Sequence, residues 1–289
     1  MREYVIVTDS SSDLPEELVR QWGLTVVPLS VEIGTDRFHN TPKEAPDGHA
    51  FYARLIKGEP VKTSAPNVEE FKDYLRPHLQ AGKDVLNLSF SSALSATYQN
   101  ACIAAEELME EFPEAAILTV DTLAASLGQG MLVDLALQQQ RKGRTIWEVR
   151  DYIEENKLHL CHWFTVGDLS QLRRGGRLSA GKAILGNLLH IKPVLHVDDG
   201  GRLVPMDSVK GRKKSIEAMF EQMKETVIDP QSQHIYISHG DCLEDAELLA
   251  SMAREQLGVP SVTIGYVGPV IGAHSGYRTL ALFFLGSKR

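Results

Sequence analysis

The sequence predicts a two-part protein, in which an N-terminal three-layer α/β domain with a parallel sheet precedes a C-terminal α+β domain with a mixed or antiparallel sheet. Three observations lead to this expectation. The chain has 289 residues, which is longer than a domain with a single hydrophobic core usually is. Short β-branched runs alternate with helical patterns in the first half, and strand-like runs predominate in the second. In the second half, Asp198-Asp199-Gly200-Gly201 separates two such runs and is typical of a β-hairpin.

The first half carries the pattern of a parallel sheet with helices on both faces. The predicted strands are residues 4–7, 24–29, 85–88 and 117–120. The first helix is expected to begin at Asp13, which caps it, with Pro15 in the first turn and Glu16 completing a capping box.

A second helix is predicted directly after Ser91. Apolar residues follow one another there at steps of four, three, four, three and four, which is the period of an amphipathic helix. We therefore expect its N-terminus to present Ser92, Ser95 and free backbone amides. The apolar residues are Leu94, Tyr98, Ala101, Ala105, Leu108 and Phe112.

The second half contains more strands than helices. Helices are expected at about residues 213–225 and 244–257, behind an antiparallel or mixed sheet. A boundary after the helix at 146–155 divides the chain into domains of residues 1–156 and 157–289. The predicted strands are residues 158–166, 193–197, 203–209, 234–238, 262–267 and 280–285.

Composition and charge exclude several classes of protein. A formal net charge of −8 argues against a nucleic-acid backbone or an anionic membrane surface as the main partner. Three cysteines without CxxC spacing predict neither a disulfide framework nor a zinc site. No apolar stretch reaches 18 residues, and residues 4–7 are too short for the apolar part of a signal peptide. We expect a cytoplasmic protein without a transmembrane segment; transient membrane contact stays open.

Four hydroxyl-rich segments stand where predicted strands end. Ligands of open α/β sheets usually bind at such ends, and hydroxyls with free helix amides suit a small anion. We expect Thr63 in a loop, Ser95 one turn inside a helix, and His274 in a turn before the last strand. Serines at strand-to-helix turns also commonly just cap helices. The segments are residues 7–15, 62–66, 91–99 and 272–276.

The usual catalytic loops are missing from the sequence. No G-x-x-x-x-G-K-[ST] or G-x-S-x-G pattern occurs, and Gly128-Gln129-Gly130 lacks the third glycine of a dinucleotide loop. Ser238-His239-Gly240-Asp241 fits a metal ligand pair or a simple turn. Basic residues concentrate at 173–177 and 210–214, where they fit either solvated helix ends or a phosphate or acidic partner surface.

These segments together resemble the DegV family, whose characterised members are the fatty-acid-binding subunits of bacterial fatty acid kinase. The resemblance spans essentially the whole chain, and it includes Ser126-Leu127-Gly128-Gln129-Gly130 and Gly175-Gly176-Arg177-Leu178-Ser179. It implies an α/β domain joined to an α+β domain, with one fatty acid whose acyl chain is buried and whose carboxyl lies near the interdomain cleft. The residues that it places around the carboxyl are Thr63, Ser95 and His274, to which we add the neighbouring Ser92.

The sequence departs from the family pattern at three places. Ala96 stands where glycine is usual, and Ala65 stands where glutamine is common. Tyr277-Arg278 replaces the Pro-Gly that often follows the histidine, and this pair is expected to reshape the cleft mouth.

The expected function is a lipid-binding subunit without catalytic residues, metal or cofactor of its own. Neutral donors would hold the carboxyl, and a separate kinase would supply ATP and Mg²⁺ to make an acyl phosphate. Arg177, Lys210 and Arg212 would help kinase docking or neutralise phosphate charge, and Arg177 and His274 would assist the transfer. One alternative is a metal-dependent hydrolase that uses Asp9, His239, Asp241 and His274. Another is a lipid-responsive sensor without phosphoryl transfer.

Overall fold

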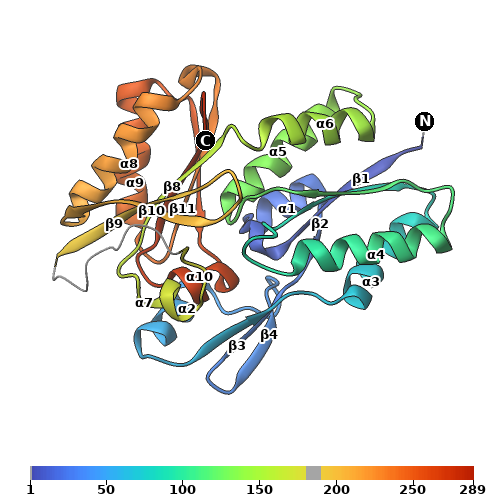
Figure 1. The fold of residues 1–289 in the computed structure, drawn as a ribbon, viewed down its shortest axis with the longest axis horizontal. Coiled ribbons are helices and arrows are strands. Elements are labelled where there is room, and N and C mark those ends of the chain that lie inside the picture. Colours follow the sequence, from blue (N-terminus) through green and yellow to red (C-terminus); the bar gives the residue numbers. More distant parts are fainter. Residues whose placement is uncertain (1, 180–189) are drawn as a thin grey trace.

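The fold was determined from a computed structural model that describes residues 2–179 and 190–289. Within these residues the strands form three sheets, with the orders β2-β1-β6-β7, β10-β9-β8-β13-β11-β12 and β4-β3-β5. Figure 1 shows the first sheet and its helices at the right, the second sheet and its helices at the left, and the smallest sheet below them. The expected combination of a parallel sheet with a mixed sheet is confirmed.

The first sheet is fully parallel and is covered on both faces. It consists of β1 (Tyr4–Asp9), β2 (Thr25–Val27), β6 (Asp84–Ser89) and β7 (Ile117–Asp121). Helices α3 (Val68–Gln80) and α4 (Thr97–Glu111) pack on one face. Helices α5 (Leu127–Arg141) and α6 (Ile146–Asn156) pack on the other, beside the short α1 (Glu16–Trp22). All six residues of β6 are buried, as expected for a strand between two helical layers.

The second sheet is mixed. Only β11 (His234–His239) and β12 (Ser261–Tyr266) pair in parallel, whereas the other neighbours are antiparallel. The hairpin predicted at residues 198–201 joins β9 to β10 and is confirmed. Helices α8 (Arg212–Thr226) and α9 (Leu243–Leu257) cover the outer face. The other strands are β8 (Leu160–Thr165), β9 (Ile191–Val197), β10 (Leu203–Lys210) and β13 (Leu280–Leu285).

The inner face of the second sheet packs against α5. Leu127, Met131 and Leu132 of this helix share one apolar cluster with the sheet, while the opposite side of α5 belongs to the core of the first sheet. Gly128 makes the close approach possible, because a Cβ atom there would clash with His162 of β8 and Phe283 of β13. One helix therefore serves both cores.

The smallest sheet was not expected from the sequence. It contains the antiparallel strands β3 (Ser30–Ile33), β4 (Asp36–His39) and β5 (Val61–Ser64). Helix α2 (Gly48–Ile56) connects β4 to β5 along the chain. Its core includes Val31 and Phe51 together with Val270 of α10 (Pro269–Ser275), far along the chain. The proposed boundary at residue 156 coincides with the last residue of α6, but contacts of α5 and of the smallest sheet cross it.

Element ends agree with the expected ones within two residues, but four local expectations are wrong. Asp13 does not cap α1, since it adopts a left-handed conformation and α1 begins at Glu16. Ser95 precedes α4, which begins at Thr97, and its Oγ accepts a bond from the Thr97 amide at 3.3 Å. Thr63 lies in β5, and His274 lies in the last turn of α10. The remaining short elements are η1 (Ser10–Ser12), α7 (Ser170–Arg174) and η2 (Pro230–Ser232).

The Asp13 carboxyl instead joins the two halves of the chain. It accepts a hydrogen bond from the Ser126 hydroxyl at 2.5 Å, and Ser126 lies 3.0 Å from the Ser238 hydroxyl of β11. Burial raises the pKa of Asp13 to about 8, against the opposing effects of Ser126 and the nearby amide of Gly268. At neutral pH the folded protein thus retains a proton on Asp13 that the unfolded chain releases.

This linkage gives a first prediction. Between the unfolded pKa of about 4 and the folded pKa of about 8, the native state binds more protons, so the free energy of unfolding falls as pH rises. Asp13→Asn removes this contribution and keeps the side-chain shape. Urea denaturation at pH 5 and pH 8 should therefore show a smaller loss of stability in the variant than in the parent chain. Equal losses in the two proteins would contradict the assignment.

Candidate functional site

A cavity lies between the inner face of the second sheet, α10 and the loop that precedes α4. Its volume is about 240 Å³. Most of its lining is apolar and comes from both halves of the chain. These apolar residues include Phe90, Leu94, Phe164, Leu203, Val270 and Phe283.

The pairing of β13 with β8 in the second sheet shows which lining residues lie farther along the cavity. Thr279, Ala281 and Phe283 line the cavity at every second position of the chain, as one face of a strand requires. Ala281 pairs with Phe164, and Phe283 pairs with His162, so the last pair lies about 7 Å beyond the first. The Phe283 and His162 rings meet edge to face at the end of the cavity away from the head cluster. His162 Nε2 is buried there and has no hydrogen-bond partner among the described residues.

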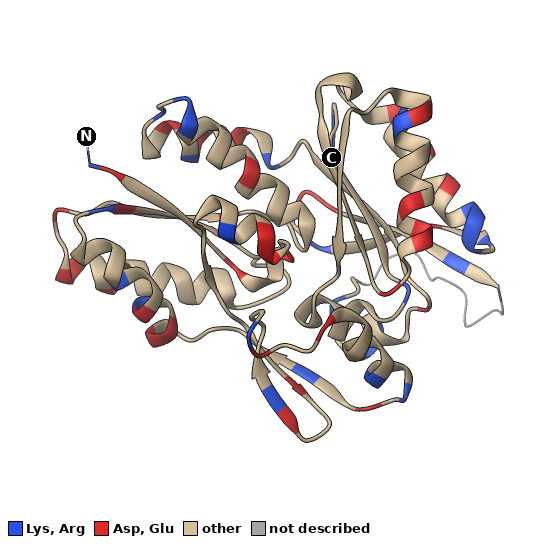
Figure 2. Cartoon of the chain, turned by 180° about the vertical axis from the view of Figure 1, so that it is seen from behind, with Lys and Arg blue, Asp and Glu red and all other residues tan. Residues whose placement is uncertain are grey.

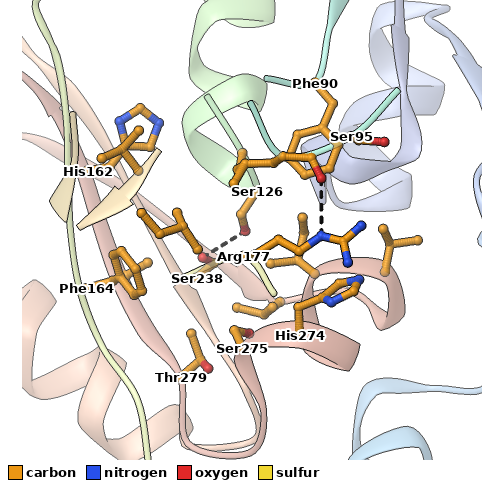
Figure 3. A pocket seen from close by; sticks show the side chains of 18 of the residues that line it. Phe90, Ser95, Ser126, His162, Phe164, Arg177, Ser238, His274, Ser275 and Thr279 are labelled. Atoms are coloured by element: carbon orange, nitrogen blue, oxygen red, sulfur yellow. Dashed lines mark hydrogen bonds between the residues drawn. The ribbon is translucent and has the colours of Figure 1, made fainter. Parts of the chain in front are cut away.

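Four polar side chains meet at the other end, and we call them the head cluster: Thr63, Ser95, Arg177 and His274. Thr63 Oγ1 lies 2.8 Å from His274 Nε2, which joins β5 to α10. Ser95 Oγ lies 2.8 Å from Thr97 Oγ1. Arg177 Nε donates to the Leu94 carbonyl at 3.3 Å, beside Ser95, as Figure 3 shows. Sequence segments around residues 63, 95, 177 and 274 therefore form one site.

The head cluster holds one full positive charge at neutral pH. Burial and, to a lesser extent, the positive charge of Arg177 lower the pKa of His274 to about 4, so the imidazole is neutral at pH 7. Arg177 is the one Lys or Arg among the described lining residues. Arg177 thus lies in the same cavity wall as the neutral donors that we expect to hold the carboxyl.

The Gly175-Gly176 pair explains how Arg177 reaches this position. Gly175 packs against the His274 ring, and a Cβ atom there would clash with Nδ1. Gly176 has a φ of 67°, which favours glycine and turns the chain after α7. A side chain at Gly175 would clash with His274, and one at Gly176 would strain the turn that leads to Arg177.

The other expected ligand and partner residues lie outside the cavity lining. Ser92 is exposed, and its amide donates to Asp121. Lys210 ends β10, seven residues or about 23 Å of extended strand beyond the lining residue Leu203. Arg212 at the start of α8 is ion-paired with Asp245 at 2.9 Å. Figure 2 shows acidic and basic segments interspersed over the outer helices.

Of the three departures from the family pattern, two concern the cavity itself. Ala65 and Ala96 line it near the head cluster, whereas Tyr277 and Arg278 do not. Arg278 shares the Asp245 carboxylate with Arg212, at 3.1 Å, and Tyr277 lies beside the Tyr52 ring.

The first hydroxyl-rich segment is structural. The Ser11 hydroxyl bonds to the Asp9 carboxylate, and Asp9 also accepts from the Phe90 amide at 2.8 Å. Ser10 Oγ accepts from the Leu29 amide. These side chains are buried, and none of Asp9 to Ser12 lines the cavity.

The four residues of the hydrolase alternative have separate partners. Asp9 is bound as described above, and Asp241 pairs with His49 at 3.1 Å. His239 accepts from the Cys242 amide, and His274 bonds to Thr63. Among residues 2–179 and 190–289, no group of three or more His, Cys, Asp or Glu side chains is arranged to hold a metal ion.

Several lining residues were missed by sequence reasoning. Ser126, Ser238, Ser275 and Thr279 add hydroxyls to the wall beyond the head cluster. Ser126 directly precedes α5, and Ser238 lies near the end of β11. Only the packing of α5 against β11 brings the two hydroxyls together.

None of the described helices is long and apolar enough to cross a membrane.

Comparison with known proteins agrees with the fold. The family described as "Uncharacterised protein, DegV family" matches residues 3–287. A DegV domain-containing protein of Clostridium perfringens is 43% identical over 289 residues, covering 100% of this chain and 99% of the relative.

Two solved structures are also similar over the full chain. A DegV lipid-binding protein from Thermotoga maritima has a TM-score of 0.86 and 29% identity, covering 99% of each chain. DegV from Bacillus subtilis, described as a fatty acid binding protein, has a TM-score of 0.85 and 27% identity, covering 99% of this chain and 100% of the other. The family match, the full-length relatives and the shared fold lead to one conclusion: this chain belongs to the DegV family.

Proposed function

We propose that this chain binds one long-chain fatty acid, presents its carboxyl to a separate ATP-dependent fatty acid kinase in the cytoplasm, and then carries the acyl phosphate. The observation that carries the proposal is a cavity with a polar head cluster at one end and an apolar wall beyond it. The lipid and fatty acid binding named for the Thermotoga and Bacillus proteins supports the choice of ligand.

Burial of the acyl chain accounts for affinity. Each buried methylene contributes about 0.8 kcal/mol, so a chain of ~16 carbons contributes of the order of 12 kcal/mol before the cost of association. The head cluster is then free to orient the carboxyl.

The head cluster provides two kinds of contact to a carboxylate. Neutral His274 can donate its Nε2 proton to Thr63 Oγ1, which leaves the Thr63 hydroxyl proton for the ligand. Arg177 adds charge to this end of the cavity. Both contacts favour the ionised carboxylate, which is the nucleophile that acyl phosphate formation requires.

In the proposed reaction, a carboxylate oxygen attacks the γ-phosphorus of ATP held by the kinase. A bond forms from the carboxylate to phosphorus, and the bond from phosphorus to the ADP oxygen breaks. Arg177 would offset the negative charge that gathers near the head cluster, while the kinase supplies ATP and Mg²⁺.

The ligand can be tested directly. Denaturing extraction of freshly purified protein should release close to one long-chain fatty acid per chain, measured by mass spectrometry, because an apolar cavity of this kind retains its lipid. Protein that carries only metal or nucleotide would contradict the proposal. Bound lipid without phosphorylation by any fatty acid kinase would favour the sensor alternative.

The head cluster predicts the effect of removing hydroxyls. Thr63→Val with Ser95→Ala removes two hydrogen-bond partners, each of which contributes ~0.5–1.5 kcal/mol. We expect fatty-acid affinity to fall roughly tenfold in a fluorescent displacement assay. Ser92→Ala is the matched control, because Ser92 is exposed outside the lining, and it should bind normally. If Ser92→Ala lowered the fatty-acid affinity and the double variant did not, the carboxyl would lie outside the head cluster.

Arg177 and Lys210 should separate carboxyl chemistry from docking. Lys210→Ala should retain fatty acid, slow acyl phosphate formation and make the remaining rate less sensitive to salt, because exposed charges act mainly on encounter. Arg177→Ala should slow the transfer with little change in its salt dependence, since Arg177 lies in the cavity wall. Opposite behaviour of the two variants in a kinase assay at low and high salt would show that the roles are reversed.

A further inference from the structure

Beyond the head cluster, four hydroxyl side chains lie in the cavity wall, and we call them the hydroxyl row: Ser126, Ser238, Ser275 and Thr279. They come from the residue before α5, from β11, from α10 and from the residue before β13. Figure 3 shows them between His274 and Arg177 on one side and Phe164 and His162 on the other. Their exposed fractions are 4%, 0%, 6% and 3%.

Two members of the row already use their hydroxyl protons. Thr279 donates to the Gly276 carbonyl at 2.8 Å. Ser126 lies 2.5 Å from the Asp13 carboxyl and 3.0 Å from Ser238 Oγ. A hydroxyl has a single proton, and Ser126 donates its proton to Asp13, so Ser238 donates to Ser126. Ser238 keeps free lone pairs that can accept a further hydrogen bond.

Ser275 has no partner at all. Its Oγ is buried and makes no hydrogen bond to any described residue. A plain acyl chain passing the hydroxyl row would leave Ser275 without a partner, and a buried polar group without a partner is costly. A hydroxyl on the chain can both donate and accept, so it can pair with Ser275 and donate to the free lone pairs of Ser238.

We propose that the cavity accepts fatty acids that carry a hydroxyl part of the way along the acyl chain, and that Ser238 and Ser275 recognise it. This inference rests on the proposed function. The sheet register supports a mid-chain position, because Ser238 pairs with Ala281. That pair lies one strand repeat, about 7 Å, short of Phe283 and His162 at the far end of the cavity.

The test compares stearic acid with its 10- and 12-hydroxy derivatives on lipid-free protein in a displacement assay. We expect the 10- or 12-hydroxy acid to bind at least as tightly as stearic acid, because Ser275 gains a partner. Weaker binding of both hydroxy acids than of stearic acid would overturn the proposal.

Single variants assign the effect to the row. Ser275→Ala and Ser238→Ala should each weaken binding of the preferred hydroxy acid about tenfold and leave stearic acid unchanged or tighter. Ser95→Ala is the control, since it should weaken both ligands equally and leave their ratio unchanged. A ratio that does not change in Ser275→Ala and Ser238→Ala overturns the inference alone. Failure of stearic acid to bind the parent chain overturns the proposed function as well.

Discussion

The packing of α5 between the two sheets is the constraint on which the cavity depends. Gly128 lets the helix approach His162 and Phe283, while its opposite side closes the core of the first sheet. The Asp13, Ser126 and Ser238 side chains continue this joint at the helix N-terminus. The hydrophobic cores of the two sheets share this one helix. Neither sheet can therefore move toward the other without disturbing its own core, and the apolar space between them stays open.

The same joint explains why the head cluster has its composition. β5 belongs to the smallest sheet, and α10 packs against that sheet, so Thr63 and His274 meet although 211 positions separate them. Gly175 packs against His274, and Arg177, in the turn after α7, is then close enough to lower the pKa of His274. A neutral imidazole beside a permanent cation is an arrangement that orients a carboxylate and keeps it ionised over a wide pH range. Catalytic power would then come from the partner that holds ATP.

The sequence alone was sufficient for elements whose pattern is local. The alternation of β-branched runs with helical patterns in the first half predicted the parallel sheet, and the strand-like runs with the Asp198 to Gly201 hairpin predicted the second sheet. It was insufficient where distant segments decide the outcome. Asp13 resembles a helix cap, but a bond to Ser126 draws its carboxyl away from α1. Arg177 resembles part of a surface cluster, yet two glycines turn it into the cavity. The smallest sheet has strands of only four residues, too short for periodicity to detect.

The central claim is that the ligand carboxyl lies at the head cluster, and the carbon-13 resonance of carboxyl-labelled palmitic acid tests it most directly. The account predicts one bound resonance, distinct from that of free fatty acid, that shifts in Thr63→Val and in Arg177→Ala but not in Lys210→Ala. A resonance at the position of free fatty acid, or one that is the same in all three variants, would contradict it.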